Sequence, residues 1–146
     1  MRLQRDTALL LIRRYAKSLS ERLRVSGQEG LIYFVSDLDP SGLDLQRAWE
    51  AALKAFGAKF EIKRVALTET QVDNLPDGAA RLGILVKPSD SRARRYVARY
   101  GERCWEADIL PGSVIRQAIR DHILSWLDVE LWDRRNDEIE AARRLL

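Results

Sequence analysis

The sequence predicts an α/β protein with a mostly parallel, doubly wound sheet and helices on both faces. Three observations support this prediction. Apolar, strand-like segments alternate with segments of helical periodicity along the 146 residues, which is typical of parallel sheets. Residues 31–36 form a continuous apolar run, as expected for a strand buried on both faces. An acidic turn follows directly, where such sheets bind ligands, beyond the carboxyl ends of their strands.

The first half of the chain gives the clearest periodicities. Residues 3–23 repeat apolar side chains at helical spacing with arginines between them, which predicts an amphipathic helix. The elements predicted next are a strand at 31–36, a turn at 37–42, a helix at 43–56 ended by Gly57, and a strand at 59–67.

The second half contains shorter segments. Thr68 and Gln71 form a capping box, which predicts a short helix. The elements predicted after it are a loop at 74–83, a short strand at 84–86, a helix capped by Ser89-Asp90 and ended by Gly101, a strand at 103–108, and a helical region from residue 113 that bends near 134–136.

The composition predicts one domain in a reducing compartment. Hydrophobic residues make up 46% and charged residues 32%, as in folded chains. We expect a single domain over 1–146, with a helix and turn at 1–30, an α/β core at 31–112 and a helical region at 113–146. The single cysteine, Cys104, cannot form a disulfide framework. No apolar run is long enough for a bilayer and no secretory pattern begins the chain, so we expect a cytoplasmic protein without a membrane partner.

The turn after the first strand contains the candidate metal ligands. Asp37 and Asp39 are two residues apart, so in extended geometry both carboxylates point to one side. A hard dication such as Mg²⁺ or Mn²⁺ relieves the repulsion between them. Ser41 and Gly42 lead into a helix whose N-terminal amides favour phosphate, a combination suited to phosphoryl transfer. In the alternative interpretation, Asp39 or Ser41 only caps that helix.

The segment Val35-Ser36-Asp37-Leu38-Asp39-Pro40-Ser41-Gly42 resembles the Asp-x-Asp-Pro-x-Gly segment of the Toprim domain. This domain occurs in topoisomerase VI A subunits and their meiotic double-strand-break relatives, and the resemblance is closest to Toprim-like proteins of phages and prophages. It continues in order through residues 64–72, 87–92 and 105–110. The resemblance implies a Rossmann-like, Toprim-like fold, DNA as partner, and Asp37 and Asp39 as the paired ligands of Mg²⁺.

Two parts of the Toprim machinery have no match. The resemblance implies a third carboxylate, a Glu at the end of an earlier strand, and a DNA-cleaving tyrosine in a separate winged-helix domain. Neither is found, and the first strand of the fold is missing. We therefore expect a domain that is not catalytic alone, with a partner chain or a missing N-terminal region supplying the Glu and the tyrosine. Whether the protein is an enzyme stays open.

Two further groups are candidate site residues. Glu106 and Asp108 form a second carboxylate pair. Either the pair completes an acidic pocket with Asp37, or Glu106 pairs with a nearby arginine and Asp108 belongs to the turn before Pro111. The helix at 89–100 carries Arg92, Arg95 and Arg99 at spacings that share one face. That face either follows a DNA backbone or is an ordinary solvated surface.

Two other functions remain alternatives. In a haloacid-dehalogenase-type phosphohydrolase, an apolar strand ends in Asp-x-Asp, with the first Asp as nucleophile and the second as general acid. Lys87 and the pair Glu106/Asp108 would then supply the downstream groups, although Pro-Ser-Gly fits the Toprim segment better. The other alternative is a non-catalytic remnant of a topoisomerase-like protein that acts as an interaction module.

Overall fold

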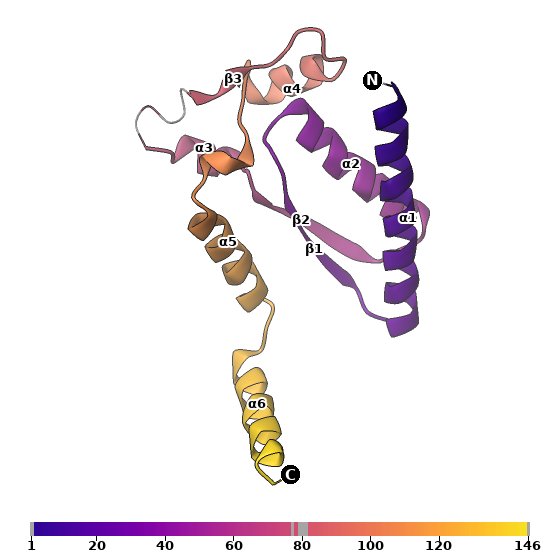
Figure 1. Ribbon diagram of the computed structural model, residues 1–146, viewed down its shortest axis with the longest axis vertical. Helices are drawn as coiled ribbons and strands as arrows, with labels where there is room; N and C mark the ends of the chain where they lie inside the picture. Colours follow the sequence, from indigo (N-terminus) through magenta and orange to yellow (C-terminus); the bar gives the residue numbers. More distant parts are fainter. Residues whose placement is uncertain (1, 77, 79–81, 146) are drawn as a thin grey trace. The chain divides into compact units, whose positions relative to one another are not determined.

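The computed structural model describes residues 2–76, 78 and 82–145. It contains two compact units, Met1–Leu110 and Pro111–Leu146 (Figure 1). The boundary between the units lies close to the predicted boundary between the α/β core and the C-terminal helical region. The first unit contains both β-strand pairs and all the candidate site residues.

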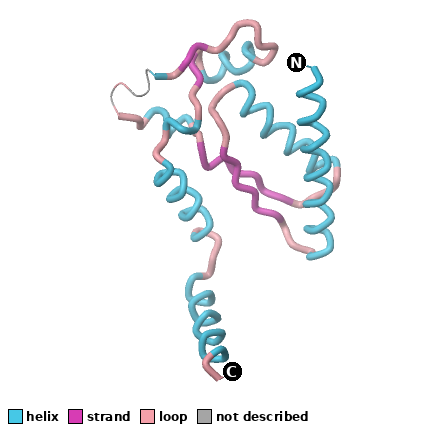
Figure 2. Tube along the Cα trace, in the orientation of Figure 1, coloured by secondary structure: helices cyan, strands magenta, loops and turns pink. Residues whose placement is uncertain are grey.

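A parallel pair of strands and two long helices form the larger part of the first unit. In chain order the elements are α1 (Arg2–Ser26), β1 (Gly30–Val35), α2 (Pro40–Ala55), β2 (Phe60–Ala66) and α3 (Glu69–Asp73). Strands β1 and β2 lie side by side and parallel, with Gly30 opposite Phe60 and Phe34 opposite Arg64 (Figure 2). The next pair is Val35 with Ala66, so β2 bulges by one residue immediately after Arg64.

Helix α1 packs against α2 through small and apolar side chains. Ile12 and Ala16 on α1 and Leu53 on α2 are buried, and the Ser20 hydroxyl donates to the Ala16 carbonyl at 2.7 Å. The predicted α/β class and the parallel pairing are confirmed, but a larger Rossmann-like sheet is not established. Within the described residues each parallel strand has only one hydrogen-bonded neighbour. Strand β1 is consequently half-buried, with Val35 exposed, and the prediction of burial on both faces was wrong.

A small antiparallel pair completes the first unit. Strand β3 (Ile84–Leu85) pairs with β4 (Arg103–Cys104), and α4 (Ala93–Tyr100) connects them. Side chains from this part form a core of Val86, Ala93, Tyr96 and Cys104. Helix α4 ends where Gly101 adopts a φ of 81°, a left-handed conformation that favours glycine.

Several predicted boundaries differ from those in the structure. Helix α2 begins at Pro40, because Asp39 caps it and proline suits the first helical position. The predicted strand at 103–108 ends at Cys104, and Ala107–Ile109 form a 3₁₀ helix, η2. The chain turns there because the Ala107 amide donates to the carboxylate of Asp37. The capping box of Thr68 and Gln71 is confirmed.

The second unit consists of α5 (Gly112–Leu124) and α6 (Val129–Arg143). The break between them lies at 125–128, earlier than the predicted bend near 134–136, because the Asp128 carboxylate caps α6 by accepting from the Leu131 amide at 2.9 Å. In the described part of the chain, no helix is both long and apolar enough to cross a membrane.

Candidate functional site

The acidic turn between β1 and α2 is held by hydrogen bonds that both of its aspartates accept from backbone amides. Asp37 Oδ1 accepts from the Ala107 amide at 2.8 Å. Asp39 has extended backbone and its Oδ1 accepts from the Gly42 amide, which makes it the N-cap of α2. Leu38 between them is buried and forms an antiparallel bridge with Trp105, with N···O distances of 2.9 and 3.1 Å. Asp39 therefore caps α2, as the alternative interpretation of the turn predicts.

Arg64 on β2 fixes the backbone of this turn from the side of the sheet. Its Nη1 lies 3.1 Å from the Ser36 carbonyl oxygen and 3.2 Å from that of Asp37. Its Nη2 donates to the Gly42 carbonyl at 3.2 Å. Burial lowers the pKa of Arg64, while Tyr100, Asp39 and Asp37 act in the opposite direction. Both aspartates of the turn therefore lie within electrostatic range of this guanidinium.

The second carboxylate pair flanks the residue that binds Asp37. Glu106 and Asp108 are exposed on either side of Ala107. Within the described ranges, no three His, Cys, Asp or Glu side chains are grouped so that they could hold a metal ion. The acidic pocket proposed for these residues and Asp37 is thus not assembled as a set of three ligands.

The turn offers a divalent cation few oxygen ligands. Mg²⁺ commonly takes one or two carboxylates and completes its octahedral shell with water and substrate phosphate. Asp37 and Asp39 each use one carboxylate oxygen, Oδ1, in the hydrogen bonds described above, so Oδ2 of each is the oxygen to consider for a metal. Two carboxylates, each with one oxygen already hydrogen-bonded, do not enclose an ion by protein ligands alone, so any ion held by Asp37 and Asp39 would have to keep most of its water ligands.

A cleft of about 680 Å³ borders the acidic turn. Leu38 and Pro40 of the turn line it, together with side chains of α2 and α4 and of the segment from Arg64 to Glu69. The cleft brings together the three arginines predicted to share a face, Arg92, Arg95 and Arg99. The charged lining comprises five arginines and three acidic residues: Arg47, Arg64, Arg92, Arg95, Arg99, Asp44, Glu50 and Glu69.

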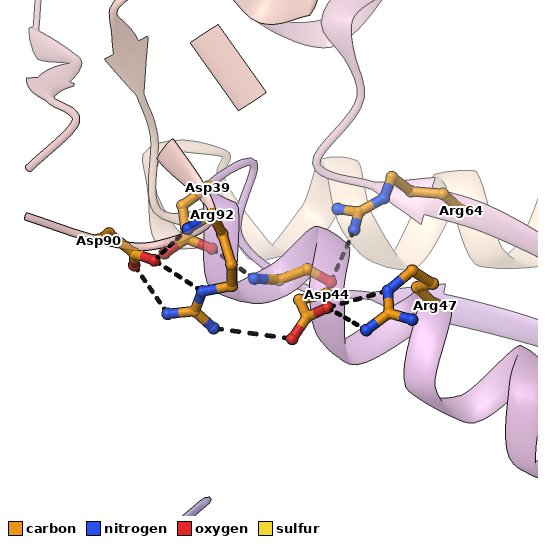
Figure 3. Close-up of polar contacts among 7 residues, drawn as sticks. Asp39, Asp44, Arg47, Arg64, Asp90 and Arg92 are labelled. Atoms are coloured by element: carbon orange, nitrogen blue, oxygen red, sulfur yellow. Dashed lines mark hydrogen bonds and ion pairs between the residues drawn. The ribbon is translucent and has the colours of Figure 1, made fainter. Parts of the chain in front are cut away.

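Two of these arginines are paired with carboxylates (Figure 3). Arg92 binds Asp90 through Nε and Nη2, at 2.8 and 2.7 Å, and its Nη1 lies 4.0 Å from Asp44. The hydrogen bond with Asp90 raises the pKa of Arg92, and the charge of Asp39 adds to this effect. Arg47 donates to Asp44 at 2.7 Å. Asp44 therefore lies between two arginines on one wall of the cleft.

Arg95 and Arg99 differ from the other arginines of the cleft. Both are exposed on α4, and neither forms an ion pair with any residue that the structure describes. The Arg99 guanidinium lies over the Tyr100 ring, 5.1 Å from its centroid. These two side chains are the cleft cations best able to bind an added anion, since Arg64 is already engaged with backbone carbonyls.

The helix that carries these arginines is anchored to the acidic turn. Tyr96 is 2% exposed, and its hydroxyl donates to the Leu38 carbonyl at 2.7 Å. Burial is the main cause that raises the pKa of the Tyr96 phenol. The turn and the arginine face are therefore parts of one connected structure.

Sequence reasoning missed three residues that shape the site: Arg64, Asp44 and Tyr96. The sequence places Arg64 only within the segment 64–72 of the resemblance and Asp44 within the helix predicted at 43–56, and it predicts no site role for Tyr96. The one available signal was an arginine directly before the apolar run Val65-Ala66-Leu67 in a predicted strand, because a charge that becomes partly buried needs several partners. Lys87, a candidate in the phosphohydrolase alternative, is exposed and forms no ion pair with any described residue.

Comparison of the chain with protein-family models, curated proteins and solved structures gives no match.

Proposed function

We propose that this protein is a Toprim-like domain that binds DNA phosphates in the cleft between α2 and α4 and that is not catalytic alone. The observation that carries the proposal is the pair of exposed arginines, Arg95 and Arg99, in a cleft bordered by the Asp37–Asp39 turn. The resemblance of the turn and of the three later segments to Toprim-like proteins of phages and prophages adds support.

Charge and hydrogen-bonding geometry favour a phosphate as the ligand of this cleft. Guanidinium groups bind phosphate oxygens through paired N–H donors, and such charge-assisted bonds are stronger than neutral ones. Arg95 and Arg99 are one helical turn apart on α4, so they can contact neighbouring phosphates of one backbone. In this proposal Asp37 and Asp39 hold a hydrated Mg²⁺, which when bound would neutralise and orient a phosphate beside the turn.

The test is the salt dependence of DNA binding, measured by fluorescence anisotropy with a labelled duplex. Each phosphate contact contributes about 0.9 to the slope of log affinity against log salt. We therefore expect Arg95→Gln/Arg99→Gln to reduce the slope by about 1.8. Arg94→Gln is the matched control, because Arg94 is exposed on the same helix but does not line the cleft.

The controls decide between the proposal and its alternatives. A reduction of about 0.9 in Arg94→Gln, the full value of one phosphate contact, would mean that DNA binds the helix surface without using the cleft. No binding by the wild-type protein at low salt would contradict the proposal and favour the interaction module. Arg92→Gln should alter the slope less than Arg95→Gln or Arg99→Gln alone, because Arg92 is already paired with Asp90 and lies near Asp44.

A further inference from the structure

Among the described residues, Arg64 is the side chain that forms the most hydrogen bonds to the acidic turn. Besides the Ser36, Asp37 and Gly42 carbonyls, its Nη1 reaches the Leu67 carbonyl at 3.3 Å and its Nε the Gln46 side-chain oxygen at 3.0 Å. These acceptors belong to the end of β1, the start of α2 and the end of β2. One guanidinium thus joins three segments that meet at the turn.

The β-bulge of β2 lies immediately after Arg64. Arg64 pairs with Phe34, whereas Ala66 pairs with Val35, so Val65 is the additional residue. Bulges change the direction of neighbouring side chains and are common beside functional sites. The carbonyl of Ser36 also accepts from the Leu67 amide at 2.8 Å, so Arg64 and the chain after the bulge bind the same oxygen.

We propose that Arg64 is the positioning residue of the acidic turn, and that it sets the placement of the Asp37 and Asp39 carboxylates through the backbone. Arg64 contacts main-chain oxygens of the turn, and the two carboxylates accept from the Gly42 and Ala107 amides instead. The backbone conformation that Arg64 holds is therefore the one in which both carboxylates reach these amides. The metal-binding part of the inference rests on the proposed function, and the placement of the turn does not.

Charge and geometry predict opposite effects at this position. Arg64 is a cation within electrostatic range of both aspartates. If its charge alone mattered, removing it would strengthen binding of a divalent cation to the turn. If positioning matters, removing it weakens that binding, and Arg64→Lys weakens it too, since an ammonium group keeps the charge but lacks the planar fork of donors.

The experiment compares Arg64→Lys and Arg64→Met with Lys63→Met. Lys63 is the preceding residue of β2, so its side chain points to the opposite face of the strand pair and its loss also removes one positive charge. Amide hydrogen exchange is measured at Gly42, Ala107 and Leu67, with Ile32 and Glu61 in the β1–β2 ladder as internal references. Mn²⁺ affinity is measured on the same folded proteins.

We expect exchange at Gly42, Ala107 and Leu67 to accelerate about tenfold in both Arg64 variants, with the reference amides unchanged. Mn²⁺ affinity should fall in both variants and stay at the wild-type value in Lys63→Met. If Arg64→Met does not fold, Arg64→Lys provides the same comparison.

Two results would overturn the inference. One is unchanged exchange at the three amides in Arg64→Lys. The other is an increase in Mn²⁺ affinity in Arg64→Met, which would show that Arg64 acts by charge. If the wild-type protein binds no Mn²⁺ but the three amides respond as expected, the metal proposal fails and the positioning role of Arg64 stands.

Discussion

The Tyr96 hydroxyl donates a 2.7 Å hydrogen bond to the carbonyl oxygen of Leu38, the residue between Asp37 and Asp39. The two residues are 58 positions apart in the chain. This bond connects the helix that carries Arg95 and Arg99 to the acidic turn. One buried hydrogen bond therefore joins the candidate cation site to the candidate anion site, and we expect substitutions at one site to affect the other.

Replacing Tyr96 with phenylalanine removes this buried bond while keeping the ring. We expect the free energy of unfolding to fall by about 1 kcal/mol, the usual net value of such a bond. Chemical denaturation measures the change. Tyr100→Phe is the control, because its ring packs against Tyr96 with centroids 5.0 Å apart. Equal stability of Tyr96→Phe and the wild type would show that the bond contributes nothing.

Asp39 has two separable roles, as helix cap and as candidate metal ligand. Asparagine caps a helix about as well as aspartate, so Asp39→Asn should keep the wild-type stability while weakening Mn²⁺ binding. Asp39→Ala removes both the helix cap and the candidate metal ligand, and its free energy of unfolding should be about 1 kcal/mol lower than that of the wild type. Urea denaturation and a Mn²⁺ titration on each variant measure the two effects. Wild-type Mn²⁺ affinity in Asp39→Asn would limit Asp39 to capping.

Gly42 lies where the first turn of α2 approaches the preceding backbone. A Cβ built at this position would collide with the Asp37 carbonyl oxygen. In an ordinary helix, replacing glycine with alanine stabilises by about 1 kcal/mol. For Gly42→Ala we expect the opposite effect: overpacking should lower the free energy of unfolding by roughly 1–3 kcal/mol. Thermal or chemical denaturation tests this, with Ser41→Ala at an exposed neighbour as the control; a more stable Gly42→Ala would contradict the observed contact.

Cys104 should be a slow nucleophile in the folded protein. Burial raises the pKa of its thiol, and the carboxylates of Asp39, Glu106 and Asp37 raise it further by disfavouring the thiolate. At pH 8 we expect alkylation by iodoacetamide to be at least about tenfold slower in the native protein than in denaturant. Equal rates in the two conditions would contradict the burial of this thiol.

The same raised pKa has a consequence for stability. Below about pH 8.5 the thiol is neutral in both the folded and the unfolded state. Above that pH the unfolded thiol ionises first, so the contribution of Cys104 to stability is lost as the pH rises toward the folded-state pKa. Denaturation curves between pH 7 and pH 10, compared with those of Cys104→Ala, should show a steeper alkaline decrease for the wild type.

The sequence by itself determined the features that depend on neighbouring residues. The order of helices and strands follows from hydrophobic periodicity, and the capping box of Thr68 and Gln71 and the stop at Gly101 are local backbone chemistry. The Asp-x-Asp turn after β1 was also visible, because the change from an apolar run to Asp37, Asp39 and Pro40 lies within a few positions.

Only the tertiary structure decided how that turn is held and which arginines remain exposed. The bonds that matter join residues far apart in the chain: Arg64 to Ser36, Asp37 to Ala107, and Tyr96 to Leu38. Periodicity gives the face of a helix on which a side chain lies, but it cannot show which partner another segment brings to it. Arg92 and Arg95 share a predicted helix face, but Arg92 is paired with Asp90, two residues earlier, and lies near Asp44 of α2, which only the tertiary structure brings to it.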